Sequence, residues 1–142
     1  MYAKNAWKKY EDSVEEVFDF CEGYKDYISV GKTERLCVEE AKRLAETKGF
    51  KPLESFKTLK AGDKVYAINK GKNIACFVIG KKLVEEGLRV LGAHIDSPRL
   101  DIKQNPLYES NGFALLDTHY YGGVKKYQWV TTPCIARGIV TH

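Results

Sequence analysis

The sequence has no Cys-x-x-Cys pair, and its cysteines lie far apart at positions 21, 37, 76 and 134. A thiolate zinc site or a dithiol redox centre would need cysteines at close spacing. We therefore interpret the cysteines as small buried apolar residues in a reducing compartment. A cysteine hydrolase would also need a partnered imidazole. The chain has only 3 histidines, and none stands in a pattern that suggests this role.

Long apolar runs are also missing. No stretch approaches the roughly 18 residues of a membrane span, and residues 1–7 lack the apolar core of a secretory signal. The net charge is +4, but the lysines are interspersed with glutamates and form no basic patch among aromatic residues. We therefore expect a cytoplasmic protein that binds neither a membrane nor nucleic acid.

The overall composition is that of a globular protein. A chain of 142 residues, 44% hydrophobic and 30% charged, is long enough to bury one core. We find no internal repeat, low-complexity tract or linker. We therefore do not expect disorder to be the main state of the chain.

The first third of the sequence predicts two helices. Apolar residues recur at steps of three and four, which predicts one buried stripe: Val14, Val17, Phe18, Cys21 and Tyr24. After Gly31, a second helix is predicted with Thr33 as its N-cap and Lys48-Gly49 as its end. Its expected exposed face holds a Glu39–Arg43 pair, and its expected buried residues are Leu36, Cys37, Ala41, Leu44 and Ala45.

Strand-like runs follow from residue 64 onward. Residues 64–69 and 73–79 predict a hairpin around Lys70-Gly71-Lys72. Residues 80–87 predict a surface loop, and residues 88–94 the next strand. Further strands are predicted at 99–103, 113–120 and 135–141, with turns at Asn105-Pro106 and Asn111-Gly112.

A His-x-Asp pair ends the predicted strand at 88–94. Side chains two residues apart on an extended backbone share one face, so His94 and Asp96 are expected to lie together. The carboxylate would hold one ring nitrogen of the imidazole, and the other nitrogen would face a metal ion. Pro98 would stop strand pairing just beyond the pair. On this spacing alone, a hydrogen-bonded structural pair without a metal is the other interpretation.

The surrounding motifs resemble one family. Gly92-Ala93-His94-Ile95-Asp96-Ser97-Pro98, followed by Tyr121-Gly122-Gly123, is similar to the aspartyl aminopeptidase family of di-zinc metallopeptidases. Upstream segments at 32–35, 48–53 and 61–66 fit the same family. The resemblance therefore covers nearly the whole chain.

The resemblance implies a fold and a function. The fold would be α/β, part of a three-layer α/β/α zinc-aminopeptidase catalytic domain. Residues 1–125 would form the amino-terminal part of that domain. Residues 126–142 would begin an inserted β-rich oligomerisation domain, cut short in the middle of a strand-like run. The enzyme would be a homo-oligomer that removes amino-terminal residues from peptides by means of a water activated by two zinc ions.

The resemblance also assigns individual residues. His94 would be a zinc ligand, and Asp96 would orient its ring. Each full-length site would hold two Zn²⁺ ions, with Mn²⁺ or Co²⁺ as possible substitutes, and the substrate would be a peptide with a free amino terminus. In this family the general base and the remaining ligands come from later sequence, so this chain alone would be inactive. His119, His142 and Trp129 are interpreted as surface, solvated and packed residues respectively.

One segment departs from the family pattern. Residues 127–133, Tyr-Gln-Trp-Val-Thr-Thr-Pro, replace the charged stretch typical of eukaryotic relatives. This departure leaves open whether the enzyme prefers acidic or neutral amino-terminal residues. Two other interpretations of the chain stay open. It could belong to a related di-zinc hydrolase, such as a deacylase or a carboxypeptidase. It could also be a non-catalytic structural or interaction domain in which His94 and Asp96 are a buried polar pair.

Overall fold

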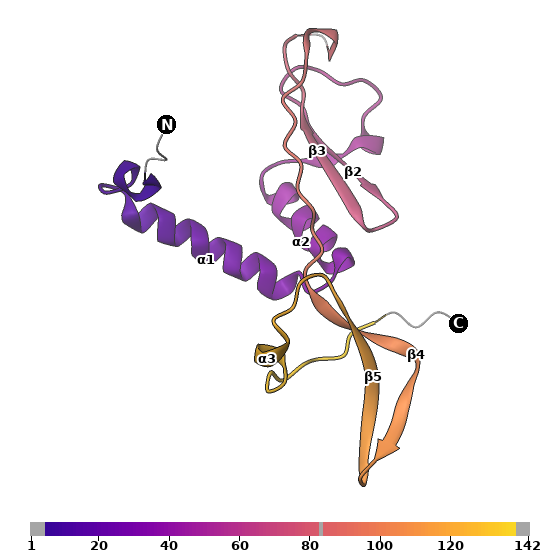
Figure 1. The fold of residues 1–142 in the computed structure, drawn as a ribbon. Coiled ribbons are helices and arrows are strands. Elements are labelled where there is room, and N and C mark those ends of the chain that lie inside the picture. The colour runs from indigo at the N-terminus through magenta and orange to yellow at the C-terminus, as the bar shows by residue number, and fades with distance from the viewer. Residues whose placement is uncertain (1–4, 83, 139–142) are drawn as a thin grey trace. The chain divides into compact units, whose positions relative to one another are not determined.

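The computed structural model describes residues 5–82 and 84–138, which fall into two compact units that meet in the sequence between Asp96 and Ser97. The first unit contains helix α1 (Val14–Val30), helix α2 (Glu34–Thr47) and strands β1 (Lys51–Pro52), β2 (Lys64–Asn69) and β3 (Asn73–Val78). The second contains strands β4 (Arg99–Ser110) and β5 (Phe113–Tyr121) and the short helix α3 (Lys126–Trp129) (Figure 1). Short 3-10 turns cover Ala6–Lys9, Leu53–Ser55 and Val84–Glu86.

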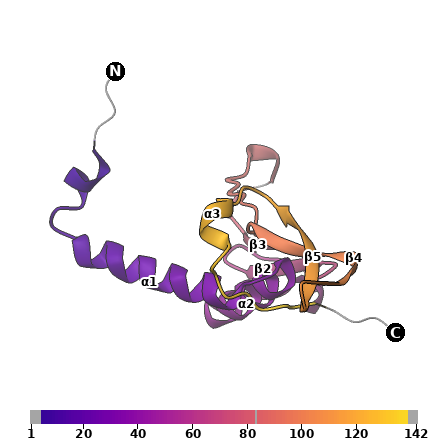
Figure 2. The ribbon, with the colours of Figure 1, turned by 60° about the horizontal axis from the view of Figure 1, so that its bottom comes forward.

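Helix α1 forms where the sequence predicts it, but its apolar stripe is not buried. No residue of the helix is buried, and Phe18 and Tyr24 are 57% and 61% exposed. A helical stripe is buried only where another element covers it. In both views only the last turns of α1 lie near α2 (Figures 1 and 2). The prediction of a core-facing stripe is therefore wrong for this chain.

Helix α2 provides much of the small core. The Thr33 hydroxyl accepts a hydrogen bond from the Leu36 N–H at 3.3 Å, and Gly49 beyond the helix end has a φ of +84°. Both features confirm the predicted ends, because an N-cap hydroxyl satisfies a free N–H and glycine tolerates positive φ. The helix packs against β2 and β3, and the buried apolar residues of the described chain are Cys37, Val38, Ala45, Val65 and Tyr66.

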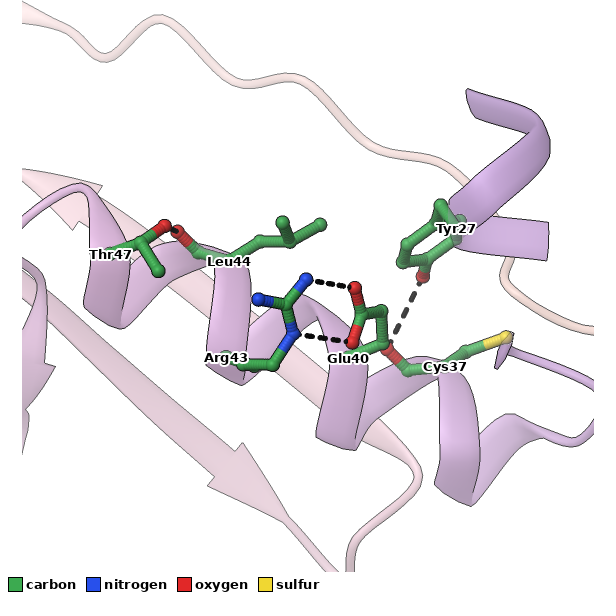
Figure 3. Close-up of polar contacts among 6 residues, drawn as sticks. All are labelled: Tyr27, Cys37, Glu40, Arg43, Leu44 and Thr47. Carbon is green, nitrogen blue, oxygen red and sulfur yellow. Dashed lines mark hydrogen bonds and ion pairs between the residues drawn. The ribbon is translucent and has the colours of Figure 1, made fainter. Parts of the chain in front are cut away.

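Burial within α2 differs in detail from the prediction. Val38 is buried although it was not expected to be, whereas Leu44 is 40% exposed. Arg43 pairs with Glu40 through two hydrogen bonds of 2.8 and 2.6 Å, and not with Glu39 as predicted (Figure 3). Glu40 is 9% exposed, and a carboxylate at such a buried position needs a charged partner.

The sheet of the first unit has the order β1-β2-β3. Strand β1 pairs with β2 in parallel, and β2 pairs with β3 in antiparallel orientation. Lys70 and Gly71 both have positive φ, 52° and 64°, as a tight hairpin connection requires. The predicted hairpin is confirmed, with β3 ending one residue earlier than expected.

The predicted strand at 88–94 is absent. These residues take no part in a described sheet, and Val90 and Leu91 are 80% and 101% exposed. A strand needs neighbours to accept its backbone hydrogen bonds, and a local apolar pattern does not supply them. No strand of the described β1-β2-β3 sheet pairs with this segment.

The second unit is built on a long antiparallel hairpin. Asn111 and Gly112 form the predicted turn with φ values of 52° and 77°, and Ser110 pairs directly with Phe113. The turn predicted at Asn105-Pro106 is wrong, because both residues lie inside β4. The register of pairing shifts between Ile102 and Leu107, so residues 103–106 form a bulge-like irregularity in β4. A bulge accommodates the missing N–H of a proline without ending the strand.

Several other expectations have mixed outcomes. The cysteines are free thiols, but only Cys37 is buried, because Cys21, Cys76 and Cys134 lie on exposed positions. Residues 135–138 form no strand, and residues 139–142 lie outside the described residues. No helix in the described part of the chain is long and apolar enough to cross a membrane. The mixed helix and sheet content agrees with an α/β class, whereas the three-layer arrangement stays a prediction.

The apolar surface of the second unit leads to a prediction about association. Tyr120, Tyr127, Val130 and Ile135 are 54%, 74%, 81% and 81% exposed, and a two-stranded hairpin is marginally stable alone. The isolated 142-residue chain is expected to associate non-specifically. Light scattering on this chain and on a longer polypeptide would test this, with a discrete oligomer expected for the longer one. A monodisperse monomer with a cooperative thermal transition for residues 1–142 would contradict the prediction.

Candidate metal site

His94 and Asp96 lie together in the first unit, as their spacing predicts. The Nδ1 atom of His94 is 3.3 Å from Oδ1 of Asp96 and 3.0 Å from the backbone oxygen of Asp96. Both contacts involve the same ring nitrogen. If Nδ1 carries the proton, Nε2 keeps its lone pair, which is the form of imidazole that binds a metal ion.

The pair is open to solvent. The side chain of His94 is 85% exposed, and that of Asp96 is 29% exposed. A histidine that serves only as a buried polar partner would be covered, so the interpretation as a buried pair does not fit this chain. The carboxylate is the more sheltered of the two groups. This arrangement suits a carboxylate that orients an accessible imidazole.

The backbone between the two residues is tied to helix α2. The thiol of Cys37 lies 3.3 Å from the carbonyl oxygen of Ile95 and 3.2 Å from that of Gly31. The sequence predicted Cys37 only as a core residue. Nothing in the local sequence indicates a contact between positions 58 residues apart.

A complete metal site is not assembled by the described residues. Within residues 5–82 and 84–138, no three His, Cys, Asp or Glu side chains come close enough to hold a metal ion together. A catalytic zinc ion has three protein ligands in most enzymes. His94 fits the chemistry of one such ligand, and further ligands are needed.

The other candidate residues play different parts. His119 lies on β5 opposite Asp101, with its Nδ1 atom 3.2 Å from the carbonyl oxygen of Tyr120. It borders a shallow hollow of about 500 Å³ that is otherwise lined by residues 102–105 of β4. Trp129 is half-buried in α3, and His142 lies outside the described residues.

The predicted Tyr-Gly-Gly segment forms the end of the hairpin. Gly122 has a φ of +74°, and a Cβ atom there would lie 3.4 Å from Pro98. Glycine suits this position because it accepts positive φ and allows close approach. The guanidinium of Arg99 lies 4.2 Å from the ring centre of Tyr121. This cation–π contact links β4 and β5 at the same end of the hairpin.

Comparison with known proteins identifies the family. Residues 27–142 match the family described as Aminopeptidase I zinc metalloprotease (M18). The chain belongs to this M18 family. The resemblance inferred from the sequence motifs is thereby confirmed.

Individual M18 relatives agree with this assignment. A probable M18 family aminopeptidase 1 from Clostridium acetobutylicum is 54% identical over 142 residues, which cover 96% of this chain and 30% of that protein. A second, from Thermotoga maritima, is 46% identical and covers 99% of this chain and 30% of that protein. The chain therefore spans about 30% of the length of these M18 relatives.

Solved M18 structures share the fold. The crystal structure of aminopeptidase I from Borrelia burgdorferi matches with a TM-score of 0.81 and 40% identity over 92% of this chain and 32% of that one. The M18 aminopeptidase structure from Thermotoga maritima gives 0.77 and 46% identity, over 94% of this chain and 29% of that one. The mixed helix and sheet fold is therefore shared with M18 aminopeptidases.

Proposed function

We propose that this chain is part of the catalytic domain of a zinc-dependent aminopeptidase, in which His94 binds one of two zinc ions. The observation that carries the proposal is the contact between Nδ1 of His94 and Asp96, which leaves Nε2 of an exposed imidazole for a metal. Membership of a zinc metalloprotease family supports zinc as that metal.

The zinc ions and the chain would contribute different parts of the chemistry. Bound zinc ions would polarise the scissile carbonyl and lower the pKa of a water molecule, with Mn²⁺ or Co²⁺ as possible substitutes. His94 would contribute its neutral imidazole as a ligand. Asp96 would keep the proton on Nδ1 and hold the plane of the ring. The general base and the remaining ligands would come from sequence beyond this chain.

The relatives also support proposals about the whole protein. Because the chain spans about 30% of their length, we propose that it is one part of a longer enzyme. From the sequence motifs we also propose that it is the amino-terminal part and that the enzyme is cytoplasmic. Residues 1–125 would belong to the catalytic domain and residues 126–142 to an inserted domain for homo-oligomer assembly. The substrate would be a peptide with a free amino terminus.

A test of this function uses the full-length polypeptide that carries the chain. We expect about two zinc ions per subunit, as in other two-metal hydrolases, and metal-dependent release of amino-terminal residues from chromogenic amides. Metal analysis and amide hydrolysis measure the two properties. A panel of acidic and neutral amino-terminal residues would show the preference that residues 127–133 leave open.

The matched control is the same amide with an acetylated amino group. An aminopeptidase should not cleave it, because its substrate amine must be free. Removal of the acetyl group would instead indicate a deacylase. Release of the carboxyl-terminal residue from a separate peptide with a free carboxylate would indicate a carboxypeptidase. Absence of both zinc and hydrolysis would support the non-catalytic interpretation and overturn the proposal.

A further inference from the structure

Cys37 is a buried thiol with two backbone partners. It lies in the first turns of α2 and is 3% exposed. Its Sγ atom is 3.2 Å from the carbonyl oxygen of Gly31, in the connection between α1 and α2. It is also 3.3 Å from the carbonyl oxygen of Ile95. Ile95 is the residue between His94 and Asp96, so the thiol reaches the backbone of the candidate site.

The contact with Ile95 is important because the site segment has little other regular support. Residues 88–98 form no strand in the described chain, so no sheet fixes their backbone. A hydrogen bond to a side chain on a packed helix replaces part of that support. A thiol has a single proton, so Cys37 must share it between the two carbonyl oxygens or alternate between them.

The surroundings of Cys37 limit its movement. A Cβ atom at Gly31 would lie 2.7 Å from Sγ, so a larger residue at position 31 would displace the sulfur. The hydroxyl of Tyr27 donates a hydrogen bond to the carbonyl oxygen of Cys37 at 3.3 Å (Figure 3). Burial is the main cause that raises the pKa of this tyrosine hydroxyl. Cys37 is therefore held from α1, from the helix connection and from α2 itself.

We propose that Cys37 is a positioning residue, whose thiol holds the Ile95 carbonyl and thereby sets the orientation of His94 and Asp96 for zinc. The inference rests on the proposed function, because it assumes that His94 is a zinc ligand. Cys37 itself does not bind the metal in this arrangement. Its role is to limit the conformations of the backbone that carries the ligand, which lowers the entropy cost of metal binding.

The test compares Cys37→Ala with Cys37→Ser in the full-length enzyme. Serine keeps an O–H donor at the same branch position in a side chain about as small as alanine, whereas alanine removes the donor. We expect Cys37→Ala to weaken zinc binding about 10-fold, the lower end of the effect of groups that orient a metal ligand. Cys37→Ser should retain most of the affinity. Chelator competition well below the unfolding temperature measures the zinc dissociation constant, and the visible spectrum of the Co²⁺-loaded protein reports the ligand geometry.

Ala45→Gly is the matched control for a purely structural effect. It lies further along α2, is 9% exposed, and should lower the unfolding temperature through weaker helix formation. We expect it to leave the zinc dissociation constant and the Co²⁺ spectrum unchanged. Cys37→Val, which fills the space but has no donor, replaces the alanine variant if the latter does not fold, and should show the same loss.

The outcomes separate this inference from the proposed function. Parental zinc affinity in Cys37→Ala, or an equal loss in Ala45→Gly, would overturn the positioning role and leave the aminopeptidase proposal intact. A loss of affinity in Cys37→Ser as large as in Cys37→Ala would also overturn it. A parent enzyme that binds no zinc would overturn the proposed function itself.

Discussion

Replacing His94 with alanine in the full-length enzyme is expected to abolish peptidase activity through loss of bound zinc. The imidazole is an exposed side chain whose Nδ1 atom is already engaged by Asp96, so the ring is prepared to bind through Nε2. Alanine has no atom that replaces a nitrogen ligand. Because the ring is 85% exposed, its removal should cost the fold little. Lost activity should therefore coincide with lost metal and not with unfolding.

Metal analysis, steady-state kinetics and thermal unfolding on the same preparation decide the point. His119→Ala is the matched control, since it removes an exposed imidazole on β5. We expect this control to keep its zinc and most of its activity. Full zinc content in His94→Ala, or equal losses in both variants, would show that the wrong histidine has been assigned.

Asp96→Asn should have a smaller effect that follows from the same contact. The amide side chain keeps the shape of the carboxylate but loses its charge, so it holds Nδ1–H less strongly. Loss of such a partner lowers metal affinity or rate by about 10–100-fold. A loss as complete as that of His94→Ala would indicate that Asp96 binds the metal directly.

Local chemistry explains which parts of the fold could be predicted. Thr33 and Gly49 mark the ends of α2, and Lys70-Gly71 and Asn111-Gly112 mark two hairpins, because each signal acts within a few residues of the chain. The contact between His94 and Asp96 belongs to the same class, since the two residues are only two positions apart. Most expectations that needed no distant partner were therefore met. The Glu39–Arg43 pair is an exception, because Arg43 pairs with Glu40 instead.

Features that depend on distant partners could not be predicted. The stripe on α1 and the run at 88–94 have the patterns of buried elements. Yet no residue of α1 is buried, and no described strand pairs with the run. The bulge at Asn105-Pro106 depends on the pairing of β4 with β5. The hydrogen bond from the Cys37 thiol to the Ile95 carbonyl oxygen joins residues 58 positions apart. Periodicity shows which face is apolar, and it does not show what meets that face.

The need for distant partners also limits what this chain can do alone. His94 provides a single imidazole, and the described residues bring no group of three potential ligands together. A catalytic zinc ion with one protein ligand would be bound weakly, and nothing would position a water molecule or a general base beside it. The chain spans about 30% of its relatives, which leaves ample sequence in a longer protein for the missing groups.

The purified 142-residue chain is therefore expected to show no peptidase activity. Assays with amino-terminal chromogenic amides in added zinc, manganese or cobalt should give rates equal to those of buffer with the same metal. The full-length enzyme, assayed in parallel, is the positive control that shows the substrates and metals are suitable. The result should not depend on metal concentration, because the defect is the absence of ligands and of a general base and not weak occupancy of a complete site. Metal-dependent turnover that co-purifies with the short chain, and that His94→Ala removes, would show that residues 1–142 assemble a working site by themselves.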